Sequence, residues 1–226
     1  MRRRRAIIAF VVGCITLILL AGAMPKMIQE SLPEQSRSHT SSEVSQSTDY
    51  DQAREDLEKL AVKGRAPKTG YERSEFGDGW AKVNGCSTRD IILYRDLENV
   101  TLEDECKVIS GTLNDPYTGE TIVFSKEQSS AVQIDHVIAL SDAWQKGAQN
   151  LTKEQRKQLA NDPLELLAVE GAANQAKSDG DAATWLPKNK GFRCVYVARQ
   201  IAVKMKYSLW VTPAEKGAMS DVLKAC

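Results

Sequence analysis

The stretch Ala131-Val132-Gln133-Ile134-Asp135-His136 is a short, largely apolar run that ends in an acidic residue and a histidine. Its composition predicts a β-strand that delivers Asp135 and His136 at its end. His136 is one of two histidines in the chain, and the other, His39, lies in Ser/Gln-rich sequence. A carboxylate beside a titratable base provides a hard oxygen ligand and a proton acceptor. The pair therefore indicates a metal-assisted hydrolase.

The residues before this strand predict a β-hairpin. Two strand-like runs, 108–113 and 120–125, flank the turn-forming sequence Asn114-Asp115-Pro116-Tyr117-Thr118-Gly119. We therefore expect a hairpin shortly before the strand that carries Asp135 and His136.

The residues after this strand predict an insertion, a second strand and a helix. A capping box opens a predicted helix over 152–160, and an apolar run at 164–169 predicts the second strand. The Ala-rich segment 170–177 predicts a helix that carries Asn174. This order of elements lets Asn174 approach the Asp135-His136 pair in a small ββα unit.

The first 23 residues predict an export signal. The basic run Arg2–Arg5 is followed by 18 uncharged, mostly apolar residues, Ala6 to Ala23, as in a secretory signal peptide or a short signal anchor. The positive-inside rule places the rest of the chain outside the cytoplasm, whether or not the leader is cleaved. Release by cleavage and membrane anchoring through residues 6–23 both remain open.

Residues 24–48 predict a disordered linker. They are rich in Ser and Gln, and they have too few large apolar side chains to offset the entropy of ordering. Helix-forming and apolar residues then recur at helical spacing over 48–63, which predicts an amphipathic helix. Residues 49–226 are long enough for one globular domain.

Four cysteines follow the leader: Cys86, Cys106, Cys194 and Cys226. In an exported protein an even number predicts two disulfides, with three ways of pairing them. Helices predicted at 192–207 and from 212 onward would form an antiparallel hairpin that brings Cys194 and Cys226 to the same end. We therefore expect Cys194 to pair with Cys226 and Cys86 with Cys106. No Cys-x-x-Cys pair supports a structural metal site instead.

The chain is not a global polycation, because its 30 basic residues are balanced by 30 acidic ones. The segment 186–214, however, contains basic residues and no acidic residue. Such a segment predicts either a phosphate-binding face or a solvated helix face. Lys188, Lys190 and Arg193, near its start, are the candidates for contacts with substrate phosphates.

The motifs around His136 resemble a known family. The run from Ile134-Asp135-His136 through 161–169 to Asn174-Gln175-Ala176-Lys177 is similar to the HNH (His-Me finger) nucleases. More closely, it resembles exported actinobacterial relatives of the C-terminal domain of GmrSD-type restriction enzymes. The resemblance extends from Gly70 to Cys226 and includes two further motifs, at 115–119 and 180–187.

The resemblance implies an α+β fold with a ββα-metal core at about 131–178, flanked by helices, a β-hairpin region and the two disulfides. It implies that His136 is the general base and that Asp135 and Asn174 bind a divalent cation, Mg²⁺ or alternatively Mn²⁺. Lys177 is expected to contact phosphate.

The resemblance also assigns Asn161 as the residue that fixes the His136 ring by a hydrogen bond. The family's middle Asn usually lies immediately before the second strand, a place that Pro163 takes here. The family also often has Pro three residues after the histidine, where this chain has Ala139. Asn161 is therefore either the residue that orients His136 or a helix C-cap, a role that suits Asn.

These observations predict an exported, metal-dependent nuclease that hydrolyses phosphodiester bonds in DNA, or in RNA, outside the cytoplasm. One alternative is a cell-envelope binding module that keeps the HNH fold without activity. Another is a hydrolase of a different substrate class. No His-Glu-x-x-His or Gly-x-Ser-x-Gly motif supports the latter.

Overall fold

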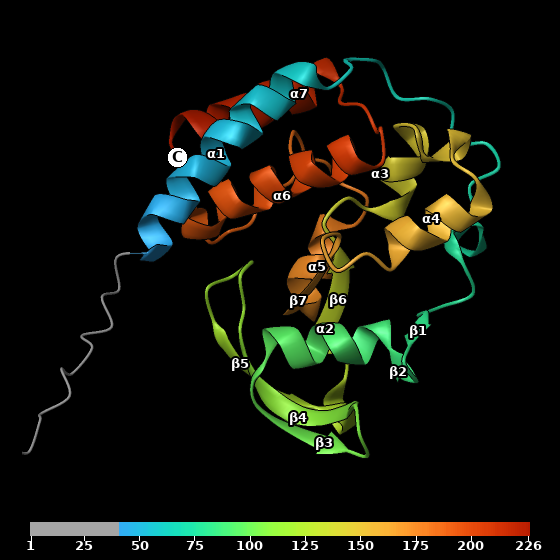
Figure 1. Ribbon diagram of the computed structural model, residues 1–226, viewed down its shortest axis with the longest axis vertical. Coiled ribbons are helices and arrows are strands. Elements are labelled where there is room, and N and C mark those ends of the chain that lie inside the picture. The colour runs from blue at the N-terminus through green and yellow to red at the C-terminus, as the bar shows by residue number, and fades with distance from the viewer. Residues whose placement is uncertain (1–40) are drawn as a thin grey trace, which may run out of the picture. The chain divides into compact units, whose positions relative to one another are not determined.

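A computed structural model describes residues 41–226 of the chain (Figure 1). The fold is mixed α and β with small sheets, as expected. The α-helices are α1 (Ser41–Lys59), α2 (Thr88–Asp96), α3 (Leu140–Gln145), α4 (Lys153–Ala160), α5 (Gly171–Lys177), α6 (Arg193–Lys206) and α7 (Pro213–Lys224). The strands are β1 (Lys82–Val83), β2 (Cys86–Ser87), β3 (Glu98–Glu103), β4 (Lys107–Asn114), β5 (Thr121–Ser125), β6 (Val132–His136) and β7 (Leu166–Glu170). Short 3-10 helices are η1 (Arg73–Phe76), η2 (Lys126–Gln128), η3 (Ala148–Asn150) and η4 (Lys190–Phe192).

The predicted leader at 1–23 and most of the predicted linker at 24–48 lie outside the described residues. The helix predicted over 48–63 is α1, which begins at Ser41 and ends at Lys59. Within residues 41–226, no helix has the length and apolar character needed to cross a bilayer.

The strands β6 and β7 form an antiparallel pair in which Ile134 lies opposite Ala168 and His136 opposite Leu166. Both strands are almost entirely buried, which explains why they read as apolar runs. The helices α3 and α4 form the insertion between them. The helix α5 follows β7 directly and packs against both strands (Figure 1). The predicted order of strand, insertion, strand and helix is therefore present.

The strands β3, β4 and β5 form a separate antiparallel sheet, and β4 and β5 are the predicted hairpin. Asp115 closes their turn, because its Oδ2 accepts hydrogen bonds from the backbone and hydroxyl of Thr118. Its Oδ1 accepts from the backbone N–H of Glu170 at 2.8 Å. This second bond joins the hairpin to the end of β7. The helix α2 packs between this sheet and β7.

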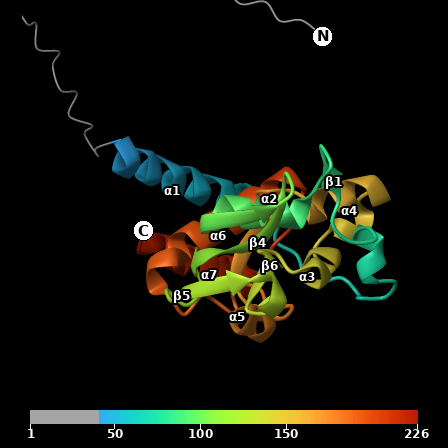
Figure 2. The same ribbon diagram turned by 90° about the horizontal axis from the view of Figure 1, so that it is seen from below.

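The helices α1, α6 and α7 pack against one another and lie side by side in both views (Figure 1 and Figure 2). The helix α7 begins with the predicted capping box, in which Thr212 and Glu215 satisfy each other's backbone N–H groups. Thr152 and Gln155 do the same for α4. Leu57, Ile201 and Leu223 belong to the same hydrophobic core as Leu167 and Val169 of β7.

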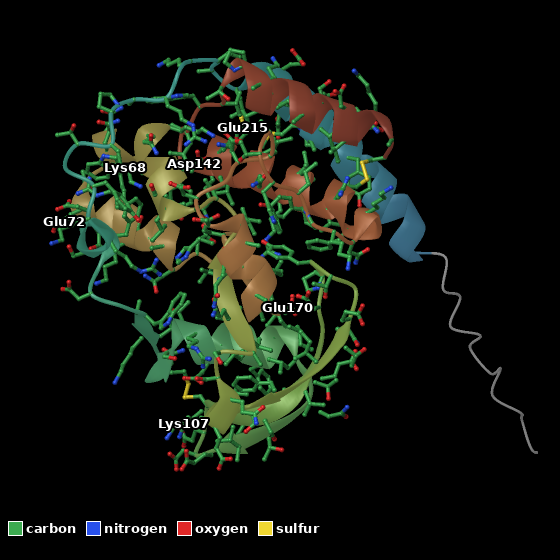
Figure 3. The ribbon with its side chains drawn as sticks, turned by 180° about the vertical axis from the view of Figure 1, so that it is seen from behind. Lys68, Glu72, Lys107, Asp142, Glu170 and Glu215 are labelled. Atoms are coloured by element: carbon green, nitrogen blue, oxygen red, sulfur yellow. A yellow bond between two sulfur atoms is a disulfide. The ribbon has the colours of Figure 1, made fainter. Side chains whose placement is uncertain are left out.

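Both disulfides have the predicted pairing and appear as yellow bonds in Figure 3. The bond between Cys194 and Cys226 joins the start of α6 to the chain end after α7, with the Cα atoms 5.9 Å apart. The bond between Cys86 and Cys106 joins β2 to the β3–β4 turn. It fixes the residues immediately before α2.

A buried ionic cluster links side chains that are far apart in the sequence. The ammonium of Lys146 lies 2.8 Å from Asp142, 2.7 Å from Asp181 and 2.7 Å from Glu215. Lys204 and Arg65 also pair with these carboxylates, so three basic groups balance three acidic groups. Figure 3 shows Asp142 and Glu215 on neighbouring elements. Because every charge is compensated, this cluster ties α3 and α7 to the loop at 178–184.

Candidate active site

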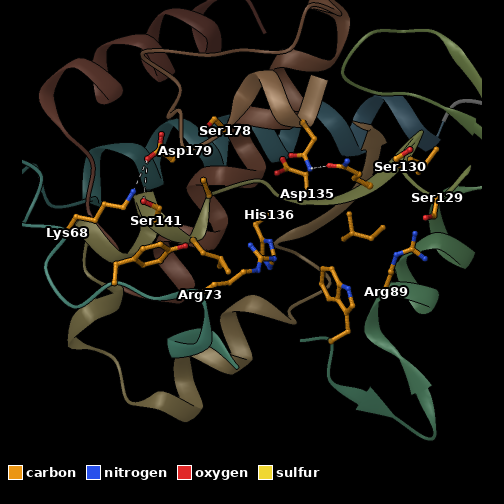
Figure 4. A pocket seen from close by; sticks show the side chains of 18 residues that line it. Lys68, Arg73, Arg89, Ser129, Ser130, Asp135, His136, Ser141, Ser178 and Asp179 are labelled. Atoms are coloured by element: carbon orange, nitrogen blue, oxygen red, sulfur yellow. Dashed lines mark hydrogen bonds and ion pairs between the residues drawn. The ribbon is translucent and has the colours of Figure 1, made fainter. Parts of the chain in front are cut away.

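A cavity of about 730 Å³ opens where β6, α5 and the loop before β1 meet (Figure 4). Asp135, His136 and Asn174 all line it. Residues separated by 38 positions in the sequence therefore converge, because β7 returns antiparallel to β6 and α5 folds back over both strands. The fold brings together the three residues that the sequence selected as the base and the cation ligands.

His136, the last residue of β6, is held by two neighbours. Its Nε2 lies 3.0 Å from the carbonyl oxygen of Ala160, at the end of α4. A carbonyl can only accept, so Nε2 carries the hydrogen and Nδ1 keeps its lone pair. The indole of Trp80 is stacked parallel to the imidazole, with ring centroids 5.8 Å apart.

The imidazole of His136 is neutral at physiological pH. Its pKa is lowered to about 3, mainly by burial, and the positive charges of Arg73 and Lys177 act in the same direction. The hydrogen bond to Ala160 acts in the opposite direction but is outweighed. A neutral ring with a free Nδ1 is the protonation state that a general base requires.

Asp135 contacts different partners from those of His136, because neighbouring residues in a strand point to opposite faces. Its carboxylate accepts hydrogen bonds from the hydroxyl of Tyr117 and from the ammonium of Lys177, the latter at 2.9 Å. Lys177 also donates to the carbonyl oxygen of His136 at 2.8 Å. The side chain of Lys177 is fully buried, so its ammonium faces Asp135 rather than solvent.

Asn174, on α5, donates from Nδ2 to Oε1 of Gln133, on β6, at 2.9 Å. Its Oδ1 has no hydrogen-bond partner among the described residues. Asn174 therefore presents a free amide oxygen at the wall of the cavity.

The free donors at this cavity are oxygen atoms, the ligand type that Mg²⁺ prefers. In residues 41–226 no group of three or more His, Cys, Asp or Glu side chains is arranged to hold a metal. Mg²⁺, however, commonly takes one or two carboxylates and obtains its other ligands from water and substrate phosphate. A carboxylate offers about four lone-pair sites, so Asp135 retains acceptor capacity beside Tyr117 and Lys177. Asp135 and Oδ1 of Asn174 are the oxygen donors at this cavity that would hold such a cation.

Asn161 is a helix C-cap, and the described residues show no hydrogen bond from it to His136. Its Nδ2 donates to the carbonyl of Lys157 at 3.0 Å, and its Oδ1 accepts from the backbone N–H of Ala81 at 2.8 Å. The preceding residue, Ala160, makes the contact to the ring through its backbone. Asn161 instead holds the loop that carries Trp80.

The basic segment at the start of α6 is not part of this cavity. Lys188, Lys190 and Arg193 are absent from its lining, and Arg193 donates to the carbonyl of Pro187 at 2.8 Å. The cations that do line the cavity are Lys68, Arg73 and Arg89. Sequence reasoning missed them, as it missed Trp80, because they lie far upstream of His136 and form no recognisable motif.

Comparison with known proteins places the chain in a family. Residues 87–222 match the C-terminal domain of GmrSD restriction endonucleases, and the chain belongs to this family. It is also similar to an uncharacterized secreted protein of Arthroderma benhamiae. The two are 39% identical over 173 residues, which cover 75% of this chain and 82% of that relative. No solved structure matches the chain.

Proposed function

We propose that this protein is an exported, metal-dependent nuclease that hydrolyses phosphodiester bonds in DNA, with His136 as general base. The observation that carries the proposal is that a buried, neutral His136 lines the same cavity as Asp135 and Asn174. Cations that line the same cavity favour a phosphate-containing substrate. Membership of a restriction endonuclease family supports the same substrate class.

In this mechanism His136 accepts a proton from the attacking water at Nδ1. The bond from Nε2–H to Ala160 fixes the tautomer and the plane of the ring. A base with a pKa of about 3 is by itself weak. A phosphate bound beside the ring adds negative charge, which raises the pKa toward the working range as the substrate arrives.

Asp135 and Asn174 would hold the divalent cation. When bound, such a cation neutralises the charge that develops on the phosphate and on its leaving oxygen. Lys177 and Tyr117 hold the carboxylate of Asp135 in place by hydrogen bonds. We therefore assign Lys177 to positioning Asp135 instead of to phosphate contact.

Export is part of the proposal. Two disulfides are stable in oxidising compartments and rare in the cytosol, and the relative from Arthroderma benhamiae is secreted. The leader predicted at 1–23 is the sequence feature that would direct export.

Cleavage assays on plasmid DNA and on RNA test this proposal. Wild-type protein should cleave DNA with Mg²⁺ and lose activity with EDTA. Asn174→Ala should raise the Mg²⁺ concentration for half-maximal cleavage by about tenfold or more. Gln175→Ala, on the same helix and exposed, is the matched amide control and should behave as wild type.

Two outcomes would contradict the proposal. Cleavage at the same rate with and without EDTA would exclude a divalent cation from the mechanism. Protein that binds DNA but cleaves neither DNA nor RNA would favour the binding module that keeps the fold without activity.

A further inference from the structure

The arginines of the His136 cavity differ from the other arginines of the described residues. Arg73 and Arg89 donate no hydrogen bond to a protein oxygen and have no carboxylate within ion-pair distance in this part of the chain. Both line the cavity. Each remaining arginine in residues 41–226 donates to at least one protein oxygen: Arg54, Arg65, Arg95, Arg156, Arg193 and Arg199.

Arg89 is half-buried although it lacks a protein partner. Burial lowers the pKa of its guanidinium. One neighbour is the ring of Phe124, whose centroid lies 5.9 Å from the guanidinium carbon. A partly desolvated guanidinium without an acceptor is unfavourable. Five N–H donors therefore remain available to an anionic ligand.

The backbone of Arg89 is rigidly held. It lies in the first turn of α2, where the hydroxyl of Ser87 caps the helix by accepting from the N–H of Asp90 at 3.1 Å. The disulfide between Cys86 and Cys106 anchors the residue before this cap. The backbone position from which the Arg89 side chain reaches the cavity is thus set by the fold and not by a surface loop.

Figure 4 shows how these groups lie along the cavity. Arg89 lies at one end with Ser129 and Ser130, whose hydroxyl groups can donate hydrogen bonds to a phosphate. His136 and Arg73 lie in the middle. Lys68 lies at the other end, where Asp179 pairs with it at 3.5 Å. The cationic groups Arg89, Arg73 and Lys68 therefore lie at different places along the cavity.

We propose that Arg89, with Ser129 and Ser130, binds a phosphate next to the one attacked, while Arg73 binds the attacked phosphate beside His136. This inference rests on the proposed function and deepens it. The substrate is then a nucleic-acid strand that extends past the cleaved bond, since an isolated phosphodiester leaves the Arg89 subsite empty.

Kinetics on two substrates test this subsite. One is a short DNA oligonucleotide, and the other is bis(p-nitrophenyl) phosphate, which has one phosphodiester and no neighbouring phosphate. Arg89→Ala should lower kcat/KM for the oligonucleotide by about 10- to 100-fold, the usual effect of losing a charge-assisted hydrogen bond. It should leave kcat/KM for bis(p-nitrophenyl) phosphate unchanged. Arg73→Ala should lower both.

Two further variants sharpen the test. Arg89→Lys keeps the charge but loses the planar fork, so its loss should be intermediate. Lys224→Ala is the control for net charge, because Lys224 is 72% exposed and, within residues 41–226, pairs with Asp221 alone. This variant should leave kcat/KM unchanged for both the oligonucleotide and bis(p-nitrophenyl) phosphate.

Binding measurements separate this inference from the proposed function. Fluorescence anisotropy with a labelled single-stranded oligonucleotide gives affinity even if no cleavage occurs. Arg89→Ala should reduce the slope of log affinity against log salt by about 0.7, the value for one phosphate contact on a single strand. An unchanged slope, or an equal loss of kcat/KM on both substrates, would overturn the proposal that Arg89 binds a neighbouring phosphate. Absence of cleavage with a reduced slope would refute only the proposed function.

Discussion

Trp80 controls the environment of His136 at the scale of single residues. The indole covers the imidazole, and burial is the main cause of its low pKa. We predict that Trp80→Ala raises the pKa of His136 from about 3 toward the ordinary value of about 6.5. Proton NMR titration measures it directly, because the chain has only His39 and His136, and a His39→Ala variant assigns the two resonances. A pKa that stays near 3 would show that Trp80 does not cause the shift.

The same shift makes stability depend on pH. The pKa of His136 is lower in the folded protein than in the unfolded chain, so the unfolded chain binds more protons between pH 3 and pH 6.5. The contribution of His136 is fully present above pH 6.5 and is lost as the pH falls toward 3. We predict that the free energy of unfolding decreases by about 1.4 kcal/mol per pH unit from this group across the window.

Urea unfolding at several pH values checks this prediction. The His136→Gln variant has no group at this position that titrates between pH 3 and pH 6.5. Its free energy of unfolding should therefore change less with pH than that of the wild type. Equal slopes for the two proteins would contradict the prediction.

The end of α4 joins two parts of the site at the scale of elements. Ala160 holds the His136 ring, and Asn161 holds Ala81 next to Trp80. We predict that Asn161→Ala lowers the free energy of unfolding by about 1–2 kcal/mol, since it removes two hydrogen bonds. It should also raise the pKa of His136, because the Trp80 loop is released. Asn161→Asp keeps the acceptor for Ala81 and should preserve the pKa, and the same NMR titration distinguishes the two variants.

Elements with local signals could be predicted from the sequence. The capping boxes of α4 and α7 and the apolar strands β6 and β7 depend on residues close in sequence, and they are where the pattern placed them. The surroundings of His136 could not be predicted in this way. Trp80, Arg73 and Arg89 reach the cavity through long-range packing, which leaves no periodic pattern. Tyr117 looked like a turn residue, yet it is buried against Asp135.

The basic segment at 186–214 shows what a local charge pattern leaves out. Its charges are continuous in sequence, but much of their binding capacity is used within the protein. Arg199 donates to the carbonyls of Pro163, Leu164 and Leu166, and Lys204 pairs with Glu215. A run of like charges predicts a phosphate-binding face only if the side chains are free.

The two disulfides act at the scale of the whole molecule. Cys194 and Cys226 are 32 residues apart, and closing a loop of this size stabilises a protein by about 4 kcal/mol in the chain-entropy model. We predict that the double variant Cys194→Ser, Cys226→Ser loses about this much free energy of unfolding in urea. It should retain its kcat/KM where it remains folded, because this bond lies outside the cavity. A loss of activity in the folded variant would show that the disulfide affects the active site.

The central claim is that His136 performs the chemistry, and single-turnover cleavage of DNA by wild type and by His136→Ala tests it most directly. Both proteins are compared with Mg²⁺, after circular dichroism has shown that the variant is folded. We predict that the rate constant falls by about 10²- to 10⁴-fold in the variant, the usual contribution of a general base. A folded His136→Ala protein that cleaves DNA at the wild-type rate would contradict the account.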